Sequence, residues 1–99
     1  MKLTLPDGRV IETSEPSHRI ALLELQYALD GFREASEAIP EDAAHDGYDA
    51  AQAVARSAAE RCRGAIGAVE EMFHALGVSP DAVTAFASRT MAPVDAFLG

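Results

Sequence analysis

Glu71 and His74 have the spacing closest to a metal-binding pattern in this sequence. They stand three residues apart in Glu71-Met72-Phe73-His74, which on a helix places a carboxylate and an imidazole on one face, as in carboxylate-bridged di-metal bundles. Such sites need several more inward carboxylates. An antiparallel pairing of the two longest predicted helices sets Glu71 level with Glu15, before the first helix begins. We therefore interpret the motif as a solvated pair, with an oligomeric metal-binding bundle built across subunits as an alternative.

Glu24 and Arg61 are a second pair of opposite charges that the predicted helices bring to one level. Glu24 interrupts the apolar arc of the first long helix, and Arg61 lies at the edge of the apolar seam of the second. A carboxylate in apolar surroundings is either paired or at the rim of an interface. The antiparallel register therefore predicts a structural ion pair between Glu24 and Arg61 across the helical hairpin.

The nucleophilic and basic side chains do not form a catalytic pattern. His18, His45 and His74 have no serine or cysteine at a spacing typical of a triad. Cys62, the only cysteine, falls in a helical seam and is expected to be a small buried apolar residue. The glycines of Gly64-Ala65-Ile66-Gly67 lie inside a predicted helix and do not follow a strand, so they form no phosphate loop. We expect no enzymatic activity and no cofactor.

Acidic residues are concentrated in the middle of the chain, which has a net charge of −8. Seven acids against one base, Arg33, give this stretch a formal charge of −6; the acids are Asp30, Glu34, Glu37, Glu41, Asp42, Asp46 and Asp49. Such a field repels nucleic acid and anionic membranes and attracts a basic surface. The arginines are dispersed without interleaved aromatic residues, so we expect no nucleic-acid partner. The acidic stretch is the predicted site for a protein partner.

The elements that position these residues begin with a predicted β-hairpin over residues 1–13. Leu5-Pro6-Asp7-Gly8 is typical of a type I turn, because proline presets the second position and glycine accepts the left-handed conformation. This turn pairs Leu3 with Ile11 and places Leu3, Leu5 and Ile11 on one face. A lone hairpin is barely stable in water, so its apolar face must pack on the helices or on another chain.

Three helices are predicted over residues 17–39, 47–76 and 80–91. Pro40 is expected to end the first helix, Gly77 the second and Pro93 the third. The apolar tail after Pro93 is expected to pack against the folded domain. The second helix carries an unbroken heptad seam, whose members are Ala51, Ala55, Ala58, Cys62, Ala65, Val69, Met72 and Leu76. The fold class is therefore mostly α: an N-terminal β-hairpin, a long antiparallel helical hairpin and a short C-terminal helix, in one domain over 1–99.

The first helix is apolar over more than half of its circumference, wider than an ordinary surface helix. Either the β-hairpin and third helix cover the extra surface, or it forms a subunit interface. We expect a small cytoplasmic protein-interaction module that self-associates, as a dimer, and binds a partner with a basic or apolar surface. Inhibitors, adaptors and assembly factors, including those of mobile elements, share its size and charge. A binder of a small anionic ligand, held by arginines at a subunit interface, is another alternative.

Overall fold

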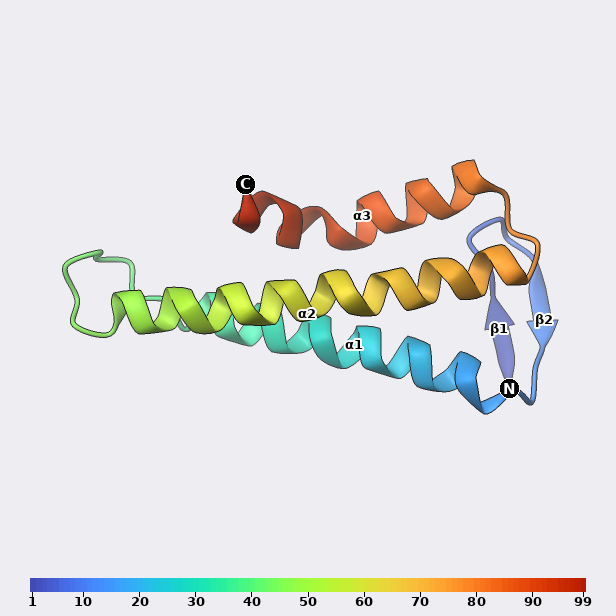
Figure 1. The fold of residues 1–99 in the computed structure, drawn as a ribbon, viewed down its shortest axis with the longest axis horizontal. Helices are drawn as coiled ribbons and strands as arrows, with labels where there is room; N and C mark the ends of the chain where they lie inside the picture. Colours follow the sequence, from blue (N-terminus) through green and yellow to red (C-terminus); the bar gives the residue numbers. More distant parts are fainter.

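The computed structural model describes residues 1–99 and confirms the predicted fold class. Two short strands, β1 (Lys2–Thr4) and β2 (Val10–Glu12), precede three helices, α1 (Pro16–Glu37), α2 (Tyr48–Ala75) and α3 (Pro80–Leu98). Helices α1 and α2 form a long antiparallel pair, and α3 runs back along α2 (Figure 1). The β-hairpin lies at one end of the helices and the loop between α1 and α2 lies at the other (Figure 1).

The β-hairpin has the predicted register and packs on the helices. Leu3 pairs with Ile11, and the Gly8 amide donates to the Leu5 carbonyl oxygen at 2.9 Å. Gly8 has a φ of 89°, a conformation that costs glycine little. Leu3 and Leu5 are buried in the same hydrophobic cluster as the helix residues, and Ile11 packs against it. The hairpin therefore gains its stability from the helices on which it lies.

The core follows two adjoining stripes of α2. Ala55, Ala58, Cys62, Val69 and Met72 of the predicted heptad seam are buried, while the remaining seam residues are half-buried. A second stripe faces α3, and its members Ala59, Ile66 and Phe73 are also buried. The Phe73 ring meets that of Phe86 of α3 edge to face, with 5.1 Å between ring centroids. Helix α2 is therefore the central element, with α1 and α3 packed on different sides of it.

Helix α2 ends at a glycine, as the sequence predicts. Gly77 has a φ of 83°, and its amide donates to the His74 carbonyl oxygen at 3.0 Å. The amide of Val78 donates to the Phe73 carbonyl oxygen, also at 3.0 Å, which completes a Schellman motif. Ser79 then caps α3 by accepting a hydrogen bond from the Ala82 amide. The observed ends of α1 and α2 lie within two residues of the predicted ones.

The predicted end of the third helix at residue 91 is wrong, because α3 continues through Pro93 to Leu98. A proline inside a helix removes one backbone hydrogen bond and costs about 3 kcal/mol. Beyond it, however, Val94 is fully buried and Phe97 meets Phe32 of α1 edge to face at 5.5 Å. We attribute the continuation of the helix to this burial, which offsets the cost of Pro93. The apolar tail docks, as predicted, but as helix.

The molecule is long and thin. Its principal extents are 50 × 25 × 17 Å and its radius of gyration is 15.8 Å, against about 13 Å for a compact domain of 100 residues. None of the helices combines the length and apolar character that crossing a bilayer requires.

Candidate interaction surface

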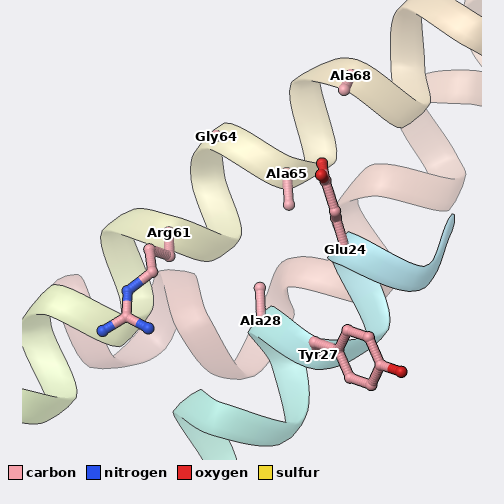
Figure 2. Close-up of a pocket in the computed structure, with 7 residues that line it drawn as sticks. All are labelled: Glu24, Tyr27, Ala28, Arg61, Gly64, Ala65 and Ala68. Atoms are coloured by element: carbon pink, nitrogen blue, oxygen red, sulfur yellow. The ribbon is translucent and has the colours of Figure 1, made fainter. Parts of the chain in front are cut away.

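A shallow groove runs between α1 and α2 on the side away from α3 (Figure 2). We call this feature the open groove. Its floor and walls are mainly small residues, with one acid, one base and one aromatic; the lining residues are Glu24, Tyr27, Ala28, Arg61, Gly64, Ala65 and Ala68. Because the small side chains of α2 do not fill the space beside α1, the helix pair is hollowed on this side.

The predicted ion pair between Glu24 and Arg61 does not form. Both residues line the open groove, so the antiparallel register brings them to one surface. Figure 2 shows the Glu24 side chain reaching from α1 toward α2, with its carboxylate beside Ala65, while the Arg61 guanidinium extends away from Glu24. The register differs from the predicted one by about one turn, and both side chains are exposed, so water solvates each charge separately.

The four ion pairs of the structure use other residues. They join the Met1 amino group to Glu12, Arg9 to Asp7, Arg33 to Asp30, and Arg63 to Asp95. Glu24 and Arg61 are therefore opposite charges on one surface without a partner within the chain.

An exposed apolar stripe of α1 runs from the open groove, which Tyr27 lines, to a second hollow that Ile20 and Leu23 line together with Met1 and Thr13. Ile20, Leu23 and Tyr27 are 53%, 38% and 70% exposed, and on α2 Val54 is 59% exposed. The first three recur at intervals of three and four residues, so they lie along one side of α1. Ile20 belongs to the wide apolar arc noted in the sequence, and neither the β-hairpin nor α3 covers it. Tyr27 and Val54 were not predicted to lie at an interaction surface, although the spacing of Ile20, Leu23 and Tyr27 indicates a common face of the helix.

The acidic residues gather at the end of the molecule that holds the α1–α2 loop (Figure 1). Asp30 is half-buried, forms an ion pair with Arg33 at 3.6 Å and accepts a hydrogen bond from Gln26. The other six are exposed and make no ion pair; they are Glu34, Glu37, Glu41, Asp42, Asp46 and Asp49. Within the loop, Asp42 accepts a hydrogen bond from the Ala44 amide. This end, which we call the acidic end, therefore carries mainly uncompensated negative charge.

Glu71 and His74 both lie exposed on α2. Glu71 borders a shallow depression with His18 and Ala21 of α1. The predicted register set Glu71 level with Glu15, whereas in the structure it lies near His18, three residues further along the chain. His18 is itself within hydrogen-bonding distance of Thr13, with 2.8 Å between Nδ1 and Oγ1. No group of three or more His, Cys, Asp and Glu side chains forms within one chain. A metal site with Glu71 and His74 would need ligands from a second chain.

Cys62 occupies the position expected of it, fully buried in the seam of α2. Desolvation raises the pKa of the Cys62 thiol, and the charge of the neighbouring Arg61 only partly opposes this effect. The thiol is therefore protonated at neutral pH and packs as a small apolar group.

No protein-family model matches this chain, and neither the curated proteins nor the solved structures contain a match to it.

Proposed function

We propose that this protein is a non-catalytic protein-interaction module that self-associates through the open groove and the adjoining apolar stripe. The observation that carries this proposal is the exposed stripe of Ile20, Leu23 and Tyr27, which starts at the groove with Tyr27 and continues along α1. Aromatic residues are enriched in protein interfaces, and contiguous exposed apolar patches mark interaction sites. The apolar ring of tyrosine can be buried in an interface, and its hydroxyl can hydrogen-bond to water in the free protein or to a partner in the complex.

The extent of exposed surface supports association. A folded monomer of this mass is expected to expose about 5,400 Å², whereas the chain exposes 6202 Å². The excess is roughly 800 Å², the area that one partner buries in a protein interface of standard size. The elongated chain therefore has enough surface beyond that of a compact monomer to form one such interface.

The acidic end remains free in such an assembly and is the second part of the proposed function. Its six exposed, unpaired carboxylates lie beyond the open groove, around the α1–α2 loop. A field of one sign speeds encounter with an oppositely charged partner and disfavours wrong ones. We propose that this end steers a partner protein with a basic surface, as in an inhibitor, adaptor or assembly factor.

The mass in solution, measured by light scattering at micromolar concentration and above, tests self-association. We expect the mass of two chains, where one chain has 10.5 kDa. Ile20→Lys places a charge in the apolar stripe and should reduce the mass to that of one chain. Thr84→Lys, at an exposed position of α3, adds the same charge elsewhere and should not. A wild-type mass of one chain across the concentration range would overturn the proposal.

A further inference from the structure

We infer that the open groove is occupied by a second copy of this chain, related by a two-fold axis, with Glu24 of each protomer paired to Arg61 of the other. This inference rests on the proposed function and names the occupant and its orientation. It starts from the two charges of the groove that have no partner within the chain.

The charges of the open groove make it complementary to itself. Its lining contains one acid, Glu24, and one base, Arg61, whose charged groups lie apart along the groove (Figure 2). A two-fold axis in the interface plane, crossing midway between them and perpendicular to the line that joins them, exchanges their positions. Each carboxylate then faces the other protomer's guanidinium, so one rotation forms two identical ion pairs. An interface of this isologous kind is the commonest in homo-oligomers.

The acidic end favours the same orientation. The line from Glu24 to Arg61 runs mainly along the helices (Figure 2), so the proposed axis sets the helical hairpins of the two protomers antiparallel. The two acidic ends then lie at opposite ends of the dimer. A parallel arrangement would bring two ends of the same sign together, in a chain whose net charge is already −8, and like charges repel.

The shape of the groove allows close approach. Ala28, Gly64, Ala65 and Ala68 provide little side-chain volume, and a Cβ added at Gly64 would meet no atom within 4 Å. Small residues at a helix interface let backbones come near each other, which strengthens van der Waals contact. The same rotation carries Val54, which lies beyond Arg61 on α2, toward the end of the other protomer's α1 that holds Ile20. The exposed apolar residues of the two helices would thus cover one another.

A second copy fits this groove better than a strongly charged partner does. The open groove has balanced charge, whereas a basic protein would be drawn to the acidic end. A second copy of the chain in the groove matches the balanced charge there, and it leaves the acidic end accessible to a basic protein.

A charge-exchange experiment tests the pairing. The Glu24→Arg chain carries two bases at the groove, and the Arg61→Glu chain carries two acids. Each variant alone should dimerise at least about tenfold more weakly than the wild type, because like charges face each other across its interface. Mixed in equal amounts they should form a heterodimer within about threefold of wild-type affinity, since both pairs are then complementary. Arg56→Glu, an exposed exchange outside the groove lining, should leave dimerisation unchanged and serves as the control.

The outcomes separate this inference from the proposed function. If the wild type dimerises and Ile20→Lys abolishes the dimer, yet the mixture is no tighter than either variant alone, the proposed pairing is wrong and association through the groove stands. If only the double variant Glu24→Arg/Arg61→Glu recovers affinity and the mixture does not, the charges act within one chain and the pairing is again wrong. A monomeric wild type contradicts both proposals. Circular dichroism and thermal unfolding of each variant establish that the monomers are folded.

Discussion

At the scale of single residues, Asp7 and Arg9 tie the β-hairpin to α2. The Arg9 amide and Nε donate to the Asp7 carboxylate at 3.1 and 2.8 Å, and its Nη2 donates to the Leu76 carbonyl oxygen at 3.3 Å. Desolvation raises the pKa of Asp7, but the hydrogen bonds from Arg9 and its charge together outweigh this and lower the pKa below its ordinary value. Ionised Asp7 therefore orients the guanidinium that reaches across to the end of α2.

The lowered pKa of Asp7 gives the hairpin a pH dependence with a definite sign. A carboxyl whose pKa is lower in the folded than in the unfolded state contributes stability that is complete above its unfolded pKa. That contribution is lost as the pH falls through the lowered, folded pKa. Urea unfolding between neutral and strongly acidic pH should show this loss in the wild type. The Asp7→Asn variant should be less stable at neutral pH and approach the wild type in acid; equal stability at every pH would show that Asp7 has no such role.

The buried thiol of Cys62 leads to a second prediction. Cys62→Ser places a hydroxyl among apolar side chains and should lower the free energy of unfolding by about 1–3 kcal/mol. Cys62→Ala, which removes only the sulfur, should cost less. In the wild type a water-soluble thiol reagent should react slowly, at a rate that follows unfolding in urea. Rapid labelling of the native protein would show that the α1–α2 seam is open at this position.

At the scale of elements, Pro93 lies inside α3 and should limit the stability of that helix. Pro93→Ala restores an amide that can donate within the helix and removes the ring clash, so we expect the free energy of unfolding to rise by about 1–3 kcal/mol. Pro80→Ala is the matched control. Pro80 occupies the first turn of α3, where a backbone amide has no acceptor within the helix, so a proline there removes no hydrogen bond. If Pro93→Ala leaves stability unchanged or lowers it, a bend at Pro93 is needed to dock Val94 and Phe97.

The same elements show how far the sequence predicts the structure. The hairpin register follows from Pro6 and Gly8, and the buried seam of α2 follows from heptad spacing, because both depend on local geometry and a strong apolar pattern. The extent of α3 could not be predicted, since tertiary burial of Val94 outweighs the local rule for proline. The surface was least predictable. Spacing brought Glu24 and Arg61 to one groove, but nothing local fixes the direction of an exposed charged side chain.

At the scale of the whole molecule, the placement of charge distinguishes the antiparallel dimer from other assemblies. In the triple variant Glu37→Gln, Glu41→Gln, Asp42→Asn, the acidic end loses half of its six exposed, unpaired carboxylates. Because the acidic ends lie far apart in the antiparallel dimer, the dissociation constant of the dimer should change by less than about twofold. Analytical ultracentrifugation measures it. A dimer that becomes much tighter in the triple variant would show that the acidic ends meet.

The triple variant also tests the proposed role of the acidic end toward a basic partner. With a lysine-rich peptide as the probe, stopped-flow association should be slower for the variant than for the wild type, and its dependence on salt should be weaker. Glu71→Gln, which removes an exposed carboxylate at the other end of α2, is the control. Unchanged association rates would mean that the acidic residues only solvate the loop.

The hydrogen bond from Arg9 to Leu76 has a consequence for the order in which the molecule comes apart. Its partners stand 67 positions apart along the chain, whereas α1 and α2 are consecutive along it. The hairpin contributes only Leu3 and Leu5 to the buried core, and segments held by few buried residues open at a lower free energy than the core does. The β-hairpin should therefore detach as a unit while the three helices remain together. Its hydrogen-bonded amides, such as that of Leu5, which donates to the Arg9 carbonyl oxygen, should then exchange with deuterium well before those at the centre of α2.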